Sequence, residues 1–407
     1  MTSQVRPPSV RGKASNPWRR EENLYPAAAR TWQPKVFIKT FGCQMNLRDS
    51  EVITGLLLES GFEVLDNLER EAEAVLLVTC SVRQHAEDKV WSEIGRLAKL
   101  APKPVIGLVG CMAENYKDAA FKRMPGIDLV VGTNNIGEIP GLLKDIFRER
   151  RETKDERRLL AVNKIKRDEF VYEPAFRQEK DRCFVVISEG CDNFCSYCVV
   201  PYVRGRLRHR QPGNILKEVE SCVEKGIKSI TLLGQNVNAY SYKDVDFIKL
   251  LELVNPIKGL KEFAFVTSHP RDASRRLFEA MAGLDKLKKS LHLPFQSGSN
   301  RILELMKRGY TREHYLHLAG EYRKIVPEGA LTTDIIVGFP GETEVDFRQT
   351  LLLIEEARFN SAYIFKYSPR GPAAASKLKD DVPKQEKERR HKILLETQKG
   401  ISKELKV

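Results

Sequence analysis

Three cysteines lie close together near the middle of the 407-residue chain, in the run GCDNFCSYC (190–198). Cys191, Cys195 and Cys198 have the spacing CxxxCxxC. Three thiolates on one short loop can bind three irons of a [4Fe-4S] cube and leave the fourth iron with an open position. A zinc knuckle is the alternative, but zinc sites usually pair two CxxC halves, and this run has no second half. The spacing therefore predicts a cluster whose open iron can activate a small molecule.

Three more cysteines are far apart in the sequence, but each directly follows a predicted buried strand. These are Cys43, Cys80 and Cys111. Because the carboxyl ends of parallel strands meet at one edge of a sheet, we expect the three thiols to converge there. Three independent core thiols are the other interpretation, yet the equivalent positions favour a second three-thiolate cluster. Cys183 and Cys222 have no ligand spacing and are expected to be structural.

The composition narrows the class of protein. Apolar residues make up 42% of the chain and charged residues 30%, as in globular proteins. No stretch approaches the ~18 consecutive apolar residues of a membrane span, and the basic opening stretch lacks the apolar segment of a secretory signal. We therefore expect a cytoplasmic protein with reduced thiols and no membrane contact. The net charge of +13 favours a polyanionic partner such as nucleic acid.

Alternating strands and helices must position these cysteines. In the first half, Val/Ile/Leu-rich runs between helical patterns predict a parallel sheet covered on both faces. Its strands are expected at 35–42, 74–79, 104–110 and 128–132, with helices at 47–60, 84–100, after Ala113 and ending near Phe147. In the second half, six further strands predict an open (β/α)6 partial barrel. They are expected at 183–188, 229–234, 262–267, 290–294, 333–338 and 361–367, with helices that include 215–225, 272–282, 299–307, 311–325 and 343–357.

The predicted fold class is therefore α/β, with a three-layer parallel-sheet domain followed by an open partial barrel. The expected parts are a disordered basic leader (1–33), the three-layer domain (34–148), a charged linker (149–180), the partial barrel (181–382) and a charged helix (383–407).

Polar and glycine-rich motifs follow the predicted barrel strands at their carboxyl ends, where barrel active sites lie. They are GQNVN (234–238), SHP (268–270), PFQSGS (294–299), Asp334 and GFPGE (338–342). Amides, hydroxyls and glycines suit the recognition of a ribose and an adenine edge. Taken singly, His269 and His292 are expected to be hydrogen-bonded structural residues rather than bases.

A basic loop, RGRLRHR (204–210), directly follows the cysteine run. A solvated surface is the ordinary interpretation of such a charge run. Its position at the barrel mouth makes phosphate contacts an equal alternative. The residues concerned are Arg204, Arg206, Arg208 and Arg210.

The cysteine loop, with Tyr197 directly before its last cysteine and a βα barrel after it, resembles the radical S-adenosylmethionine superfamily. Both cysteine sets, in this order, are similar to the methylthiotransferases of that superfamily, from residue 35 to about residue 400. Within them the chain most resembles the tRNA-modifying branch that acts on isopentenylated adenosine. The matching stretches are TFGCQMN (40–46), TCSVRQHAEDKV (79–90), GCMAE (110–114), CVVPYVRG (198–205), LLGQNVNAY (232–240), LHLPFQSGS (291–299) and TDIIVGFPGETE (333–344).

The resemblance implies two [4Fe-4S] clusters and two uses of S-adenosylmethionine. One molecule methylates a sulfide of an auxiliary cluster. The other is cleaved reductively to a 5′-deoxyadenosyl radical, which activates carbon-2 of adenosine 37 beside the anticodon. The implied ligands are Cys191, Cys195 and Cys198 for the radical cluster and Cys43, Cys80 and Cys111 for the auxiliary cluster. The candidate S-adenosylmethionine contacts are Tyr197, Gln235, Asn236, Asn238, Ser268, Gln296, Ser297, Asp334, Gly338 and Glu342. The implied partners are the tRNA anticodon loop, an electron donor such as flavodoxin or ferredoxin, and a system that supplies sulfur or clusters.

The chain departs from this family pattern in three places. Leu207 and His209 stand where relatives commonly have an acid and a serine, and the stretch 367–374 lacks the usual Gly-Thr pair. Relatives continue into a small RNA-binding β-barrel, the TRAM domain, which is expected to be absent from this chain. Three other functions compete: methylthiolation of a ribosomal-protein aspartate, methylthiolation of threonylcarbamoyladenosine in tRNA, and RNA binding by an iron–sulfur protein without catalysis. The motifs TCSVRQHAEDK and QNVNAY favour the isopentenyladenosine branch.

Overall fold

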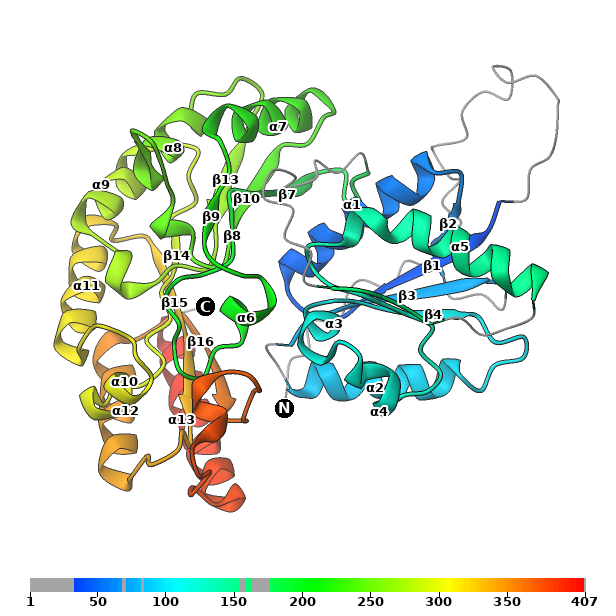
Figure 1. Ribbon diagram of the computed structural model, residues 1–407. Helices are drawn as coiled ribbons and strands as arrows, with labels where there is room; N and C mark the ends of the chain where they lie inside the picture. The colour runs from blue at the N-terminus through cyan, green and yellow to red at the C-terminus, as the bar shows by residue number, and fades with distance from the viewer. Residues whose placement is uncertain (1–32, 68–70, 82–83, 154–157, 163–175, 406–407) are drawn as a thin grey trace. The chain divides into compact units, whose positions relative to one another are not determined.

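The computed structural model describes residues 33–405 except 68–70, 82–83, 154–157 and 163–175 (Figure 1). The leader predicted over 1–33 therefore lies outside the described residues apart from Gln33, as does much of the linker predicted over 149–180. No helix in the described ranges is both long enough and apolar enough to cross a membrane.

The first part of the described chain is a parallel sheet with the strand order β2-β1-β3-β4-β5-β6. Its strands are β1 (Lys35–Thr40), β2 (Glu63–Leu65), β3 (Ala74–Thr79), β4 (Val105–Gly110), β5 (Leu129–Val131) and β6 (Leu159–Ala161). Every residue of β3 and β4 is buried, because helices cover both faces of a parallel sheet. The strand order reverses between β1 and β3, and ligands of such open sheets bind at that point.

Alternate residues of β3 show how the two faces are covered. Leu76 and Val78 pack against α1 and α5, whereas Val75 and Leu77 pack against α2, α3 and α4, as Figure 1 also shows. The helices are α1 (Gln44–Glu59), α2 (Gln84–Leu97), α3 (Cys111–Tyr116), α4 (Ala119–Arg123) and α5 (Ile139–Glu152), with a 3-10 turn η1 (Ile136–Glu138) before α5. The predicted three-layer arrangement is present. The helix expected after Ala113 begins earlier, at Cys111, because Gly110 turns the chain sharply with a φ of 94°.

The second part of the chain contains six parallel strands with helices between them. The strands are β7 (Arg182–Val186), β10 (Ser229–Leu233), β13 (Glu262–Phe265), β14 (Ser290–His292), β15 (Ala330–Val337) and β16 (Ser361–Lys366). They form two three-stranded sheets, β13-β10-β7 and β14-β15-β16. A parallel bridge between Phe263 and Leu287 joins the sheets just before β14 begins. These six strands form the partial barrel that the sequence predicts.

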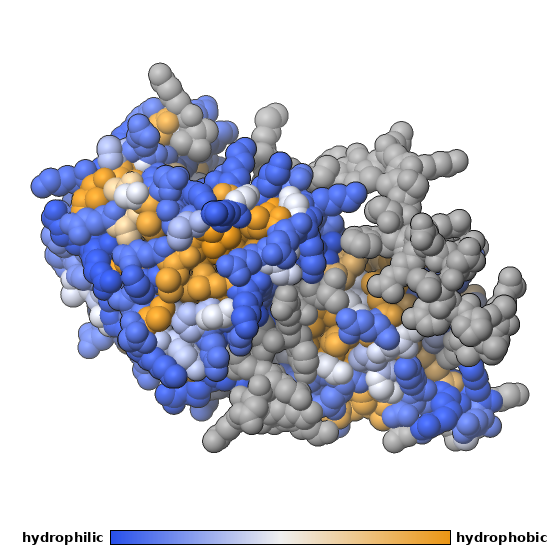
Figure 2. All heavy atoms as spheres, turned by 90° about the horizontal axis from the view of Figure 1, so that it is seen from above, coloured by the Kyte–Doolittle hydropathy of each residue, from blue (hydrophilic) through white to orange (hydrophobic). Residues whose placement is uncertain are grey.

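The partial barrel packs its helices against the outer face of the strands. On β15, Leu331, Ile335 and Val337 are buried in the core with the helices, while the alternate residues Thr332 and Asp334 are half-exposed on the inner face. The helices are α6 (Val200–Val203), α7 (Pro212–Glu224), α8 (Phe247–Val254), α9 (Arg275–Gly283), α10 (Asn300–Leu305), α11 (Arg312–Ile325), α12 (Glu344–Ala357) and α13 (Lys384–Glu404). Short pieces complete the chain: β8 (Ser188–Glu189), β9 (Arg208–His209), β11 (Ser241–Tyr242), β12 (Val245–Asp246), η2 (Val237–Ala239), η3 (Pro270–Asp272) and η4 (Ala374–Lys377). The surface seen in Figure 2 is largely hydrophilic, with apolar side chains gathered in patches among charged ones.

Candidate active site

The loop that carries the CxxxCxxC cysteines begins at a glycine that no other residue could replace. Gly190 has a φ of 78°, and a Cβ atom there would collide with the backbone oxygens of Gly205 and Arg206. Its N–H donates to Oε1 of Gln235 at 2.6 Å, and the N–H of Cys191 donates to the carbonyl of Gly205 at 3.2 Å. The first cysteine is thereby fixed at the carboxyl ends of β8 and β10.

The other end of this loop is anchored on the segment that ends α10. Ser196 donates through its N–H to the carbonyl of Met306 at 3.0 Å and through its hydroxyl to the carbonyl of Leu305 at 2.7 Å. A turn follows in which the N–H of Cys198 donates to the carbonyl of Cys195 at 2.9 Å. Backbone hydrogen bonds therefore hold all three cysteines in place before any cofactor binds.

The thiols of Cys191 and Cys198 in this loop lie in surroundings that oppose their ionisation. Burial, together with the negative charge that Cys195 and Cys191 would carry, raises the pKa of Cys198 to about 12. Burial also raises the pKa of Cys191, and Cys195 adds to that shift. Three neighbouring thiolates repel one another, so they need cations to become ligands together. The irons of a [4Fe-4S] cluster would supply that positive charge.

The predicted auxiliary cysteines converge at the switch point of the parallel sheet. Cys43 directly precedes α1, Cys80 follows β3, and Cys111 is the first residue of α3. A Cβ atom on Gly42 would collide with Cβ of Cys80, which shows how closely the two turns approach. The Asn46 side chain ties them together, because its amide nitrogen donates to the carbonyl of Thr79 at 2.9 Å and its oxygen accepts from the N–H of Cys43 at 3.2 Å.

The charges around these three thiols differ from those in the first loop. A hydrogen bond with Cys80 lowers the pKa of Cys43 to about 6, and the charge of Arg204 lowers it further. Burial raises the pKa of Cys111, although Arg204 also donates to that thiol. Cys80 and Cys111 are buried, whereas Cys43 is exposed. The set therefore has a guanidinium on its inner side and solvent on its outer side.

Neither cysteine set has the geometry of a single-ion site. No three Cys, His, Asp or Glu side chains in the described ranges lie close enough to bind one metal ion. The donor chemistry of each set fits a [4Fe-4S] cluster, because three thiolates can each bind one iron of the cube and leave the fourth iron open.

Buried polar atoms without partners mark a further binding surface at the carboxyl ends of β10 and β13. The Oδ1 atom of Asn236, the Oγ atom of Ser268 and the Nε2 atom of His269 have no hydrogen-bond partner among the described residues. Burial lowers the pKa of His269 to about 2, so the ring is neutral near pH 7. Buried polar groups in proteins are normally satisfied, so these atoms fit a polar ligand such as the ribose and adenine of S-adenosylmethionine.

Several predicted cofactor contacts are instead engaged within the protein. Asn238 uses both ends of its amide on the backbone of His269, at 3.0 and 2.9 Å. The Ser297 hydroxyl is fully buried and lies 3.5 Å from the Thr350 hydroxyl. Gln235 holds the first cysteine loop, as described above. These residues position the loops around the site, and their contact with a cofactor stays a prediction.

The other predicted contacts lie around β15 and within the first cysteine loop. Asp334 lies 3.4 Å from Nε2 of His292 on the inner face of the strands. Glu342 accepts from the N–H of Gly338 at 2.6 Å and from Arg390 at 2.7 Å. The backbone of Gln296 forms a parallel bridge with β15. The Tyr197 hydroxyl accepts a hydrogen bond from Arg308 at 3.3 Å.

The four arginines of the basic loop do not share one surface. Arg204 is 5% exposed and pairs with Asp49 at 2.6 Å. Arg210 is also buried and forms an ion pair with Glu218, and Arg208 is half-buried with Glu189 at 3.4 Å. The side chain of Arg206 is 75% exposed and pairs with Asp192 at 2.7 Å on the surface. Burial against carboxylates leaves Arg206 as the arginine of this loop that is most open to a phosphate.

Sequence reasoning missed two features of the site. Arg308 donates to Sγ of Cys195 at 3.3 Å, although it lies 113 residues away in the chain and belongs to no recognisable motif. Cys183 and Cys222 contact each other with their Sγ atoms 3.2 Å apart. That pairing joins β7 to α7 inside the core, and it fits the structural role that the sequence predicts for both cysteines.

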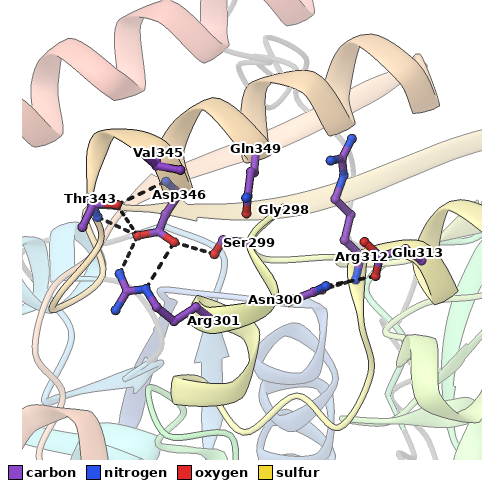
Figure 3. Close-up of a pocket in the computed structure, with 10 residues that line it drawn as sticks. All are labelled: Gly298, Ser299, Asn300, Arg301, Arg312, Glu313, Thr343, Val345, Asp346 and Gln349. Carbon is purple, nitrogen blue, oxygen red and sulfur yellow. Dashed lines mark hydrogen bonds and ion pairs between the residues drawn. The ribbon is translucent and has the colours of Figure 1, made fainter.

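A separate cavity of about 360 Å³ lies where α10, α11 and α12 begin (Figure 3). Its charged groups are paired within the protein: Arg301 with Asp346, and Arg312 with Glu356 at 3.1 Å. Beneath it, Gly298 packs so closely on α12 that a Cβ atom would lie 2.6 Å from Cα of Thr350. No cysteine lines the cavity, and its paired charges serve to fix the loop of residues 296–299.

Comparison with known proteins shows the family of this chain. Residues 185–354 match the Radical SAM superfamily, and residues 35–132 match a family described as Uncharacterized protein family UPF0004. A tRNA-2-methylthio-N(6)-dimethylallyladenosine synthase from Moorella thermoacetica is 45% identical over 90% of this chain and 82% of its own length. A protein of the same name from Acetivibrio thermocellus is 43% identical over 95% of this chain and 81% of its own length. The chain belongs to the tRNA-2-methylthio-N(6)-dimethylallyladenosine synthase family.

Two solved structures resemble this radical S-adenosylmethionine methylthiotransferase in fold alone. The radical S-adenosylmethionine methyltransferase TsrM from Kitasatospora setae aligns with a TM-score of 0.57 at 16% identity, over 84% of this chain and 77% of TsrM. The cobalamin-dependent S-adenosylmethionine radical enzyme OxsB aligns with a TM-score of 0.54 at 13% identity, over 91% of this chain and 56% of OxsB. The predicted family is thus confirmed, together with the α/β class and the succession of a parallel-sheet domain and a radical S-adenosylmethionine domain.

Proposed function

We propose that this protein transfers a methylthio group to carbon-2 of an isopentenylated adenosine, at position 37 of tRNA, by radical S-adenosylmethionine chemistry. The names of relatives that are 43–46% identical to this chain support this reaction and substrate. In this proposal the cluster at one cysteine set supplies the electron that cleaves S-adenosylmethionine, and the cluster at the other set supplies sulfur. A one-electron donor such as flavodoxin or ferredoxin and a sulfur supply are then required. Because the substrate is tRNA, we expect the protein to work in the cytoplasm.

The observation that best supports sulfur insertion is the contact between the two cysteine sites. Cys111 packs against Val199, which directly follows the last cysteine of the loop, and against Val203, the last residue of α6. Thr133 also donates to the carbonyl of Val203 at 2.7 Å. A radical generated at one site can activate a carbon that receives sulfur from the other only if both lie beside the same substrate atom. The packing of Cys111 on α6 supports the proposal, because it keeps the two cysteine sets close to each other.

The residues of the chain itself prepare this chemistry in three ways. The loop anchors hold the thiols in fixed positions before the cofactor binds, which reduces the entropy that binding would cost. The buried side-chain oxygens of Asn236 and Ser268, which have no hydrogen-bond partner among the described residues, provide partners for a nucleoside. Burial of Cys191 and Cys195 keeps most solvent away from the first cysteine loop, which strengthens electrostatic interactions there.

The test separates the two cysteine sets in anaerobically reconstituted protein. One variant replaces the loop cysteines Cys191, Cys195 and Cys198 by alanine. It is expected to contain half the iron of the parent and to form no 5′-deoxyadenosine. A second variant replaces Cys43, Cys80 and Cys111 by alanine. It is expected to contain half the iron of the parent and to keep 5′-deoxyadenosine formation, but not to methylthiolate tRNA. Unchanged iron content in either variant would contradict the ligand assignment.

Mass analysis of tRNA nucleosides decides the substrate. A strain that lacks the gene is expected to accumulate isopentenyladenosine without its methylthio group and to regain that group when the gene is restored. A deficit confined to threonylcarbamoyladenosine, or to a ribosomal-protein aspartate, would assign the chain to one of those substrates instead. Parent protein that forms no 5′-deoxyadenosine would indicate RNA binding without catalysis.

A further inference from the structure

Arg308 lies between α10 and α11, and its guanidinium group reaches the first cysteine loop. One terminal nitrogen donates to Sγ of Cys195 at 3.3 Å, and the other donates to the carbonyl of Pro294 at 2.9 Å. The remaining nitrogen donates to the Tyr310 hydroxyl at 3.0 Å. The residue is only 4% exposed, so the surrounding protein leaves little access for water to its charge.

Arg308 differs from every other buried arginine in the described ranges. Its hydrogen-bond partners are the Cys195 thiol, the hydroxyls of Tyr197 and Tyr310 and the carbonyl of Pro294, and none of them is a carboxylate. Each of the others forms an ion pair with an aspartate or a glutamate. These are Arg48 with Asp49, Arg204 with Asp49, Arg210 with Glu218, Arg370 with Glu87, and Arg390 with Glu342.

A buried cation without an anionic partner is costly, and proteins retain one where a negative group faces it. Cys195 is the group in contact with Arg308 that becomes negative when it binds iron. We propose that Arg308 is a positioning residue for the cluster of this loop, where its charge offsets the Cys195 thiolate and raises the reduction potential of the cluster. This inference rests on the proposed function, because the cluster itself is assigned there.

The direction of the effect follows from the charge change on reduction. One electron passes from a reductant to the cluster and adds one negative charge, with no bond made or broken. A fixed positive charge next to a ligand sulfur stabilises the more negative, reduced state more than the oxidised state. Hydrogen bonds to the sulfur atoms act in the same direction. Arg308 thus makes the cluster easier to reduce for a one-electron donor.

The experiment measures the midpoint potential of the cluster in the full chain. Replacing Cys43, Cys80 and Cys111 by alanine leaves one cluster, so the electron paramagnetic resonance signal belongs to it during an anaerobic dithionite titration. Arg308→Gln is expected to shift the reduction equilibrium at least tenfold toward the oxidised state, which corresponds to a potential lower by about 59 mV. Arg308→Lys keeps the charge and is expected to stay within that range of the parent. Arg348→Gln, on the outer surface of α12, is the matched control with an unchanged potential.

Each outcome bears on a different statement. Equal potentials in the parent, Arg308→Gln and Arg308→Lys would overturn the role of Arg308, and a lowered potential in both variants would overturn the role of its charge. If Arg308→Gln takes up no iron while Arg308→Lys does, the charge is needed for ligation and the proposal stands. If neither takes up iron, the charge does not explain the need for Arg308 and the proposal fails. A parent without a cluster would refute the proposed function rather than the role of Arg308.

Discussion

Replacing Arg204 by glutamine tests how charge is balanced between the two cysteine sites. Arg204 pairs with Asp49 at 2.6 Å and faces Glu189 at 3.9 Å, and little of either carboxylate is exposed. Breaking a buried ion pair usually costs about 3–5 kcal/mol, because one charge is left without a partner. Here Asp49 keeps Arg48 at 3.5 Å and Glu189 keeps Arg208 at 3.4 Å. Each carboxylate therefore keeps a cationic partner when Arg204 is replaced.

We therefore expect Arg204→Gln to lower the free energy of unfolding by about 2–3 kcal/mol, the value of lost hydrogen bonds to charged groups. The assay is urea unfolding followed by circular dichroism on protein without iron. Asp49→Asn and the double variant complete a cycle, whose coupling energy is expected to be about 2 kcal/mol. Arg348→Gln is the control, because its side chain is 73% exposed and its ion pair with Glu344 spans 3.7 Å. Surface pairs of that kind contribute about 0–1 kcal/mol.

Two results would refute this reasoning from opposite sides. A loss of 5 kcal/mol or more, well above the range of about 2–3 kcal/mol for charged hydrogen bonds, would show that Arg48 and Arg208 do not compensate. A loss no larger than that of the control would show that Arg204 does not hold Asp49 in solution.

Three further predictions concern other parts of the chain. Cys183→Ser and Cys222→Ser should each keep full iron content and turnover, because their sulfur atoms contact each other in the core, and loss of a cluster in either would show a ligand role. A hydrogen bond from Arg96, aided by Lys39, lowers the pKa of Glu93 from 4.5 to about 2. The stability that this carboxylate contributes is therefore present above pH 4.5 and lost as the pH falls toward 2, so the deficit of Glu93→Gln in thermal midpoint should vanish over that interval. Arg206→Gln should weaken tRNA binding and reduce the slope of log K against log salt by about one; an unchanged slope in filter-binding titrations would remove Arg206 from the interface.

The sequence alone determined the cysteine sets and the sheet that carries one of them. Strands such as β3 and β4 consist almost wholly of Val, Leu, Ile and Gly because both of their faces are buried, so their position and parallel order follow from local composition. Cys43, Cys80 and Cys111 could be expected to converge because the geometry of a parallel sheet brings equivalent strand ends to one edge. Cys191, Cys195 and Cys198 needed no tertiary information, since one short loop holds them all.

Only the tertiary structure decided which charges and sulfur atoms face one another. Arg204 and Arg206 are two residues apart and look alike in the sequence, yet one is buried against Asp49 and the other is open to solvent. Arg308 reaches Cys195 across 113 residues, and no local pattern predicts that contact. The energy of a buried charge depends on which groups the fold places within a few ångströms of it, and those groups come from distant segments. Residue type and spacing fix the ligands of a site, whereas the charges around those ligands are set by packing.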